Sequence, residues 1–298
     1  MGTGVSYQAA WRSLGAVCAG GLLLMAGPAV GAPAQSRYFI SSDGVRLHYL
    51  EAGPSGAPTV VFVPGWTMPA WIFERQIEAF SKTRHVIAFD PRGQGDSEIA
   101  KAGYEPGRRG QDIGELIDRL GAGQVVVVAW SLGVLDTLAY VKTSGDARIA
   151  GLVLVDNSVG EGPPASSPTT GVKAPPHTIA RDPFVKGMFR TRQDAGFLKR
   201  LVAASQRTPE TAARALRAYP WPRSDWRETL HGMAKPVLYV IRPHLEEQAR
   251  DPVGSDRFAE SVLFAKTGHA LFVDEPERFD AVVADFIARR VWPAKAAP

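Results

Sequence analysis

The sequence contains almost no cysteine, since Cys18 is the single one among 298 residues. One thiol cannot form a disulfide within the chain, nor can it build a cysteine-based zinc site. The excess of charge is also small, because 34 basic and 30 acidic side chains leave a net charge of +4. This weak and evenly spread excess argues against nucleic acid as a partner. With 45% hydrophobic and 21% charged residues, the composition is that of an ordinary globular protein.

Charged side chains are nearly absent from the first 34 positions, where Arg12 is the only one. An apolar run at 14–25 follows, and residues 32–34 read Ala-Pro-Ala, which fits a signal-peptide cleavage pattern. Residues 1–34 therefore predict a signal peptide and an exported protein, periplasmic or secreted, with no membrane span after cleavage. The uncharged stretch 13–36 is long enough to cross a bilayer, so an uncleaved membrane anchor is the alternative.

Short apolar runs alternate with amphipathic stretches through the rest of the chain. The strand candidates are 46–50, 59–63, 85–89, 124–129, 149–155, 237–241 and 261–264. Apolar residues at helical spacing indicate helices at 113–120 and 279–287. Such alternation predicts an α/β fold, with a doubly wound, mostly parallel sheet covered by helices on both faces.

The alternation stops between residues 160 and 228, where the sequence shows no strand pattern. This stretch opens with a loop rich in glycine and proline, and helical pieces follow. We expect residues 160–228 to form a helical lid over a core built from 35–159 and 229–298. Aromatic side chains in the lid are candidates for an apolar substrate pocket or for contacts that attach the lid to the core.

One junction between a strand and a helix carries the chemistry. The apolar strand leads into residues 129–133, which read Ala-Trp-Ser-Leu-Gly, and a helical pattern follows at once. This is the nucleophile-elbow pattern G-x-S-x-G, with Ala129 in the first glycine position. Small residues on either side of Ser131 suit a strained turn that exposes the hydroxyl. The helix directs its N–H groups at the negative charge that develops there. We therefore predict that Ser131 is a nucleophile.

A serine hydroxyl needs a general base, and the sequence offers six histidines. His269 follows the last strand candidate and precedes the last helix, in a loop flanked by glycine. That position lies at the carboxyl edge of the predicted sheet, where sites form in open α/β folds. His269 is therefore the predicted base.

Together these segments resemble the α/β-hydrolase superfamily, specifically a serine-nucleophile member with a helical lid, over nearly all of the predicted mature chain. Three further motifs carry the resemblance. Residues 63–66, Val-Pro-Gly-Trp, are similar to the oxyanion loop of the family. Residues 90–97 resemble its D-x-R-G-x-G-x-S loop, and residues 112–121 resemble the helix that precedes the nucleophile strand. We interpret the loop 90–97 as structural.

The resemblance implies a catalytic triad and an oxyanion hole formed by the N–H groups of Leu132 and Trp66. Pro64 stands where the family usually has a histidine that braces the oxyanion loop. Trp66 and Trp130 flank the serine, either as an apolar wall for an acyl group or as packing for the loops. Both interpretations remain open from the sequence.

The acid of the implied triad is ambiguous. The family commonly places it after the strand here at 237–241, in a G-x-x-D turn. This chain instead has Arg-Pro-His-Leu at 242–245, followed by Glu246. A family variant places the acid after the preceding strand, where Asp156 directly follows residues 149–155. We favour Asp156 over Glu246 as the carboxylate that orients His269.

These features favour an exported serine hydrolase that cleaves a carboxylic ester or similar acyl bond in a small molecule, through an acyl-enzyme. The mechanism needs no metal or organic cofactor, and the sequence shows no cluster with metal-ligand spacing. Serine at position 131 disfavours members with an aspartate nucleophile, such as dehalogenases and epoxide hydrolases. A lactonase, a carbon–carbon hydrolase or a cofactor-free haloperoxidase shares the triad, and a catalytically silent member would bind an apolar ligand under the lid. The sequence leaves the acyl length and the oligomeric state open.

Overall fold

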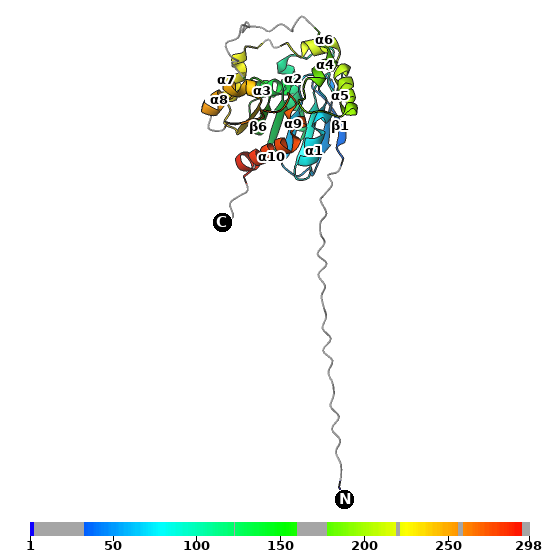
Figure 1. Cartoon of the computed structure of the whole chain (residues 1–298), viewed down its shortest axis with the longest axis vertical. Helices are drawn as coiled ribbons and strands as arrows, with labels where there is room; N and C mark the ends of the chain where they lie inside the picture. The colour runs from blue at the N-terminus through cyan, green and yellow to red at the C-terminus, as the bar shows by residue number, and fades with distance from the viewer. Residues whose placement is uncertain (3–32, 122, 160–177, 219–220, 256–258, 294–298) are drawn as a thin grey trace. The chain divides into compact units, whose positions relative to one another are not determined.

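The computed structural model describes residues 1–2, 33–121, 123–159, 178–218, 221–255 and 259–293. Almost all of the predicted signal peptide, and the first part of the predicted lid at 160–177, lie outside the described residues. Every helix and strand of the described residues belongs to the compact unit Gly31–Pro298 (Figure 1). Within the described ranges, no helix has both the length and the apolar character needed to cross a membrane.

An eight-stranded sheet lies at the centre of this unit, in the order β1-β2-β4-β3-β5-β6-β7-β8. β1 pairs with β2, and β2 with β4, in antiparallel fashion, whereas all other neighbours are parallel. The predicted mostly parallel sheet is therefore confirmed. Its strands are β1 (Gln35–Ile40), β2 (Arg46–Ala52), β3 (Thr59–Val63), β4 (His85–Asp90), β5 (Val125–Trp130), β6 (Ile149–Val155), β7 (Val237–Ile241) and β8 (Ala259–Leu263).

Strands β5 and β6 are apolar at every position because both faces of the sheet are covered. In β5, Val125 and Val127 belong to one hydrophobic core, and Val126 and Val128 belong to the other. All four side chains are at most 2% exposed. Burying each one stabilises the fold by about 1.5 kcal/mol or more relative to leaving it in water. This rigid strand ends at the serine.

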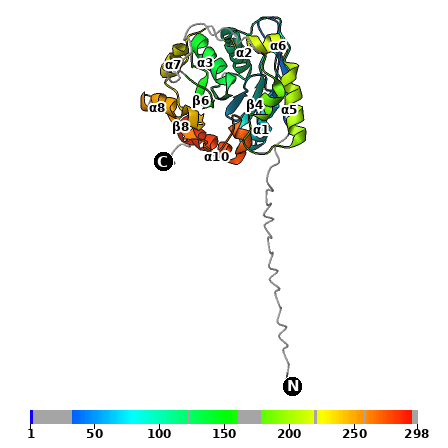
Figure 2. The same ribbon diagram turned by 45° about the horizontal axis from the view of Figure 1, so that its top comes forward.

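Helices form a layer on each face of the sheet, as the sequence predicted. Side chains of α2 and α3 belong to one core and those of α1 and α10 to the other, and Figure 2 shows these two pairs on opposite sides of the strands. The helical elements outside the insertion are η1 (Ala70–Phe73), α1 (Glu74–Phe80), α2 (Pro106–Arg119), α3 (Leu132–Ser144), η2 (Pro243–Leu245), α8 (Glu246–Ser255), α9 (Leu271–Asp274), α10 (Pro276–Phe286) and η3 (Ile287–Val291).

Between β6 and β7, the described residues form helices and no strand. These are α4 (Arg181–Lys186), α5 (Ala195–Arg207), α6 (Glu210–Ala215) and α7 (Arg223–His231). Together with the described segments that connect them, we call these helices the insertion. The insertion contacts the loops at the carboxyl ends of the strands. Trp66 Nε1 donates to Ala213 O at 2.7 Å, and the N–H of Ala270 donates to Met188 O at 3.0 Å. The exact domain boundaries stay predictions.

Candidate active site

Ser131 occupies the turn between β5 and α3, with φ 54° and ψ −119°. This left-handed conformation is costly for a residue with a side chain, and such strain is concentrated at functional sites. Gly133 makes the turn possible, because a Cβ there would lie 2.5 Å from the carbonyl oxygen of Val63. Asn157 supports the turn from β6, since its Nδ2 donates to Ser131 O at 2.6 Å.

Residues with strained backbone conformations lie close to this serine at one edge of the sheet. Among the described residues, three other than glycine have positive φ: Thr67 at 59°, Ser131 at 54° and Asp156 at 49°. They follow β3, β5 and β6, which are neighbours in the sheet. Each such residue costs about 1–3 kcal/mol. Their placement at one sheet edge marks it as the candidate site.

The structure brings Ser131, His269 and Asp156 into one line of hydrogen bonds. His269 Nε2 lies 2.8 Å from Ser131 Oγ, and His269 Nδ1 lies 2.6 Å from Asp156 Oδ2. The Asp156 side chain is fully buried, whereas that of His269 is 24% exposed. Burial by itself raises the pKa of Asp156, but the hydrogen bond and charge of His269 and the charge of Arg242 outweigh it, so the pKa lies below its ordinary value. Asp156 is therefore an ionised acceptor for the imidazole.

Glu246, the alternative acid, does not take this position. It is an exposed residue at the start of α8, and no hydrogen bond between it and His269 is found among the described residues. Arg242, which follows β7, instead donates from Nε to Asp156 Oδ2 at 2.6 Å. The end of β7 thus contributes a cation beside the carboxylate from β6.

The loop that carries His269 is held from two sides. Trp130 Nε1 donates to His269 O at 2.9 Å, and the two rings lie 5.1 Å apart. On the other side, a Cβ on Gly268 would lie 2.3 Å from Met188 O in the insertion. Trp130 is only 1% exposed, so of the two roles open to it, packing of the histidine loop is the one that the geometry supports.

Asp274 connects this loop to the insertion. Its carboxylate accepts from the N–H of Gly268 at 2.6 Å, from the N–H of Arg190 at 2.8 Å and from the N–H of Thr191 at 3.0 Å. The hydroxyl of Thr191 donates to it as well, at 2.6 Å. One side chain therefore fixes the residue before His269 and the chain that precedes α5.

The predicted oxyanion loop lies directly against the serine. A Cβ on Gly65 would be 2.9 Å from Ser131 Cβ and 3.4 Å from Ser131 Oγ. Leu132 is the first residue of α3, where backbone N–H groups have no partner within the helix. Gln94 braces the loop in place of the missing histidine: its Oε1 accepts from Thr67 N at 2.7 Å, and its Nε2 donates to Gly65 O at 3.1 Å.

Trp66 extends from this loop into the insertion. Its ring packs edge-on against Phe184 at 5.0 Å, and the guanidinium groups of Arg181 and Arg217 lie 4.3 and 5.2 Å from its centre. Burial lowers the pKa of both arginines, although Glu210 partly compensates. Trp66 itself is 8% exposed, so its side chain anchors the insertion beside the serine.

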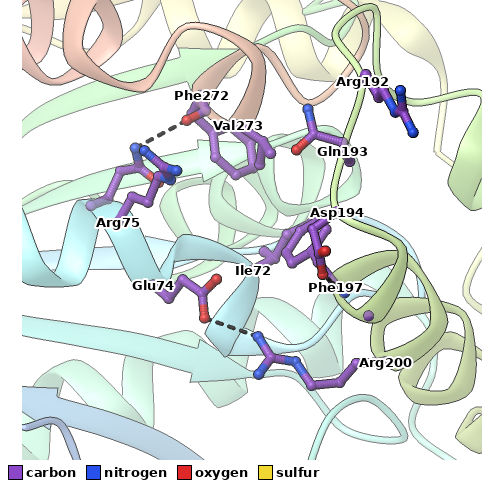
Figure 3. A pocket seen from close by; sticks show the side chains of 12 residues that line it. Ile72, Glu74, Arg75, Arg192, Gln193, Asp194, Phe197, Arg200, Phe272 and Val273 are labelled. Carbon is purple, nitrogen blue, oxygen red and sulfur yellow. Dashed lines mark hydrogen bonds and ion pairs between the residues drawn. The ribbon is translucent and has the colours of Figure 1, made fainter.

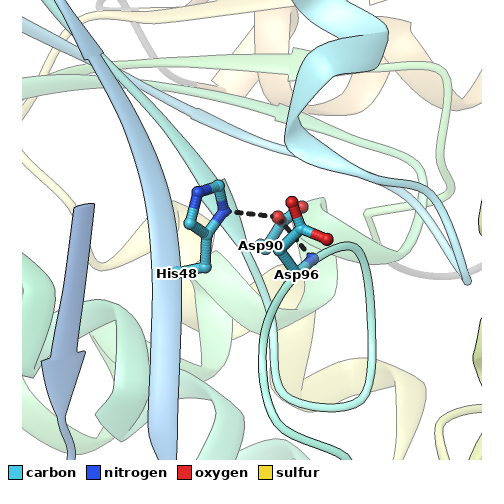
Figure 4. Close-up of side chains that lie close together, drawn as sticks. All are labelled: His48, Asp90 and Asp96. Carbon is cyan, nitrogen blue, oxygen red and sulfur yellow. Dashed lines mark hydrogen bonds and ion pairs between the residues drawn. The ribbon is translucent and has the colours of Figure 1, made fainter. Parts of the chain in front are cut away.

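His48, Asp90 and Asp96 form the one group of histidine and carboxylate side chains in the described ranges that is close enough to bind a metal (Figure 4). The acceptor atoms of this group are already in use. Asp90 Oδ2 pairs with His48 Nδ1 at 2.7 Å and accepts from Asp96 N at 2.9 Å, while Oδ1 accepts from Ala70 N. These hydrogen bonds indicate that the Asp90 carboxylate holds the surrounding loops together, in agreement with the interpretation of the loop 90–97 as structural.

A cavity of about 570 Å³ opens next to α5 (Figure 3). Neither Ser131 nor His269 lines it, although Phe272 does, and the Phe272 ring also lies 5.1 Å from that of Trp130. Arginines and carboxylates face this cavity, and Arg200 pairs with Glu74 at 2.9 Å. The cavity is a polar hollow separate from the serine.

Sequence reasoning gave no role to three residues that hold the site together: Gln94, Asp274 and Arg242. For Arg242 a signal was available. It follows β7 as Asp156 follows β6, and these strands pair in register at Val155 and Val240. A cation and an acid at equivalent strand ends are expected to meet.

The structure thus combines an eight-stranded, mostly parallel sheet with a strained serine that is hydrogen-bonded to an imidazole. A profile of the alpha/beta hydrolase family matches residues 60–282. The chain belongs to this family.

Individual relatives differ in activity. The chain is 32% identical over 116 residues to a non-heme chloroperoxidase of Streptomyces lividans. The aligned stretch covers 39% of this chain and 42% of that protein. It is 36% identical over 107 residues to epoxide hydrolase A of Mycobacterium tuberculosis, or 35% of this chain and 33% of that protein. The chain thus spans less than half the length of these curated relatives.

Solved structures extend the likeness to the whole fold. The crystal structure of an esterase from Rhodococcus sp. ECU1013 matches with a TM-score of 0.70 and 22% identity, over 86% of this chain and 99% of that one. Identity at this level shows the fold.

Proposed function

We propose that this protein is an exported serine hydrolase that cleaves a carboxylic ester or similar acyl bond in a small molecule. The observation that carries the proposal is the line of hydrogen bonds from Ser131 Oγ to His269 Nε2 at 2.8 Å, and from His269 Nδ1 to Asp156 Oδ2 at 2.6 Å. A hydroxyl, an imidazole and a buried carboxylate in this order are the parts of an acyl-transfer triad.

In the proposed reaction, Ser131 Oγ attacks the carbonyl carbon of the ester while His269 Nε2 takes the hydroxyl proton. Asp156 holds the imidazole and stabilises its positive charge. The N–H groups of Leu132 and Trp66 donate to the oxyanion. Collapse expels the alcohol, which takes the proton from His269 and leaves the acyl group on Ser131.

Water then completes the cycle. His269 takes a proton from a water molecule, which attacks the acyl carbon and forms a second tetrahedral intermediate. Collapse returns the proton to Ser131 Oγ and releases the carboxylic acid. Every proton and bond is accounted for by these three side chains and water, so the cycle needs no metal or organic cofactor.

We assign the insertion the role of a lid over the acyl site. Trp66 supports this role, because it carries the proposed oxyanion N–H on its backbone and contacts Phe184 and Ala213 of the insertion through its side chain. Closing helices over a serine excludes water from the reaction and strengthens its electrostatic interactions. Around Trp66 the insertion presents both an apolar ring, Phe184, and the guanidinium groups of Arg181 and Arg217.

Perhydrolysis is the second candidate, and the similarity to a non-heme chloroperoxidase favours it. Hydrogen peroxide would replace water in attack on the acyl carbon, so that Ser131 is regenerated and a peroxycarboxylic acid leaves. That product oxidises halide in solution without a cofactor. Formation of peracid from an ester and peroxide, compared with formation of acid at the same enzyme concentration, separates the two candidates.

Export is proposed on the sequence of residues 1–34. The mass of the product from an expressing cell tests it. A mature chain that begins near Gln35 supports cleavage and export, whereas retention of residues 1–34 in a membrane fraction supports the anchor.

The test of the hydrolase proposal is reaction with a fluorophosphonate probe together with a panel of p-nitrophenyl esters of graded acyl length. Wild-type protein should be labelled and should turn over at least one ester, and Ser131→Ala should do neither. Absence of labelling and turnover in folded wild type would instead support a catalytically silent binding protein. Labelling that persists in Ser131→Ala would place the nucleophile elsewhere.

A further inference from the structure

Asp156 Oδ2 is shared by two partners, a guanidinium and an imidazole. Arg242 Nε donates to it at 2.6 Å, and His269 Nδ1 lies 2.6 Å from the same atom. The backbone N–H of Arg242 also points to the other oxygen, Oδ1, at 3.3 Å. The carboxylate that orients the imidazole is therefore held by a guanidinium at the same time.

The topology makes this contact a fixed one. Asp156 follows β6 and Arg242 follows β7, and the N–H of Asp156 donates to Val240 O at 2.9 Å as the ladder between these strands ends. The Asp156 side chain is fully buried, and that of Arg242 is 28% exposed. A partly buried pair with a backbone hydrogen bond in addition loses little attraction to solvent screening.

Asp156 and Arg242 act on the reaction in opposite ways. Asp156 stabilises a proton on His269, which the reaction needs in its transition state. Arg242 offsets part of that stabilisation, because a positive charge nearby disfavours a second one. In general, an imidazole whose proton is less stabilised can act as a base at lower pH.

Other titratable groups near the pair do not supply this charge. Asp274 accepts from Gly268, next to His269, and is a carboxylate. The hydroxyl of Tyr239, on β7, donates to Asn157 O, and burial together with the charge of Asp156 raises its pKa, so it stays neutral. Arg242 is the cation that contacts Asp156 within the described part of the chain.

We infer that Arg242 is a positioning residue that holds Asp156 against His269 and extends the activity of the triad toward lower pH. This inference rests on the proposed roles of Ser131 and His269. It assigns a purpose to the end of β7, the strand after which the family commonly has its acid.

The experiment compares kcat/KM against pH for p-nitrophenyl acetate, a neutral ester, in wild type, Arg242→Gln and Arg242→Lys. In Arg242→Gln the acidic limb should move up by about one pH unit, which is a loss of about ten-fold at a pH well below the limb. The plateau at high pH should change much less. Arg242→Lys keeps the charge and should recover at least half of the shift.

Arg223→Gln is the matched control. Arg223 is exposed, lies in the insertion and donates to Ser158 Oγ at 3.3 Å, two residues from Asp156 in the sequence. Its replacement removes the same charge near the same strand end without touching Asp156. The pH profile of this variant should superimpose on that of wild type.

A second readout is independent of turnover. NMR can follow the His269 ring resonances as the pH changes. The midpoint of their shift should rise in Arg242→Gln by the same amount as the acidic limb of the kcat/KM profile. If folded wild type neither hydrolyses esters nor reacts with the phosphonate while this midpoint still rises, the proposed function fails and the electrostatic role stands.

An unchanged NMR midpoint in Arg242→Gln overturns the inference. So does an acidic limb that coincides with that of wild type despite a lower rate, because the arginine would then serve only packing. Arg242→Met, which has a similar linear side chain, is the substitute where Arg242→Gln does not fold, and the same two results decide.

Discussion

Gly65 and Ser131 lie so close together that no side chain fits between them. A Cβ built on Gly65 would be 2.9 Å from Ser131 Cβ and 3.2 Å from the ring of Trp130. The bare backbone of Gly65, in the loop after β3, therefore packs directly against the side chains of Ser131 and Trp130. This contact sets the distance between the proposed nucleophile and the N–H of the next residue, Trp66.

Gly65→Ala should therefore damage the reaction more than the fold. The added methyl group must push the oxyanion loop away from Ser131, and misplacement by about 1 Å can lower a rate by about a hundred-fold. We expect kcat/KM on the preferred ester to fall at least about ten-fold, while overpacking lowers the free energy of unfolding by about 1–3 kcal/mol. Gly56→Ala, at a position with open space around it, is the control and should match wild type.

The second prediction concerns the acid. Asp156→Asn should lower kcat by about 10⁴-fold, because the amide favours the wrong tautomer of His269. Glu246→Gln should stay within about two-fold of wild type, since Glu246 is exposed at the start of α8. Steady-state kinetics on both variants check this. Similar mild losses in the two variants would show that neither carboxylate has the assigned role.

A third prediction tests the loop at 90–97 as a structural element. Arg92 is fully buried and donates to both oxygens of Asp112, at 2.6 and 2.7 Å. Asp112→Ala leaves that guanidinium without its main partner, although Asp43 still pairs with it at 2.9 Å. We expect the free energy of unfolding in urea to fall by about 3 kcal/mol or more.

Asp182→Ala is the control for this change. Asp182 pairs with Lys186 at 2.9 Å, but both side chains are more than half exposed. Loss of such a pair should cost about 0.5 kcal/mol or less. Equal losses in the two variants would mean that burial of the arginine contributes nothing.

The fourth prediction is a dependence of stability on pH. Burial raises the pKa of Asp280 from 3.8 to about 6, despite a hydrogen bond from Gln76. The folded state thus binds this proton more tightly, so the stability it brings is complete below about pH 4 and is lost as the pH rises through 6. Asp280→Asn should match wild type at pH 4 and exceed it at pH 7.5, by about 1 kcal/mol after allowance for solvent screening.

Urea unfolding at these two pH values measures the effect. Asp285→Asn, on the same helix but exposed in a pair with Arg289, should show no such difference between the two pH values. An Asp280→Asn variant that is less stable than wild type at pH 7.5 would contradict the prediction.

The buried strands could be predicted closely because their pattern is local. Candidates 59–63, 149–155 and 237–241 coincide with β3, β6 and β7, whose two faces are both covered. β1 (Gln35–Ile40) was missed, since it is an edge strand whose first four residues are exposed and which pairs through its backbone with β2. Its apolar stretch, residues 38–40, is too short to stand out as a strand pattern.

In the candidate site, too, the residues that stand in local sequence motifs could be predicted, and the contacts between distant segments could not. Ser131 and His269 stand in local motifs, and the structure joins them by a hydrogen bond between residues 138 apart in the chain. The choice between Asp156 and Glu246 depends on which carboxylate reaches His269 in space, and no local pattern contains that information. The pairing of Arg242 with Asp156 also joins two strands, and its signal in the sequence becomes readable only once β6 and β7 are known to be neighbours.

Asp274 has a consequence for engineering the substrate range. Its carboxylate joins Gly268, beside the imidazole, to Arg190 and Thr191 in the insertion. A chimaera that carries foreign helices between β6 and β7 without equivalent donors would leave the Asp274 carboxylate without these hydrogen bonds. The loop that carries His269 would then be less firmly held. Successful transplants must therefore carry the 190–191 amides with them, even where those residues never meet a substrate.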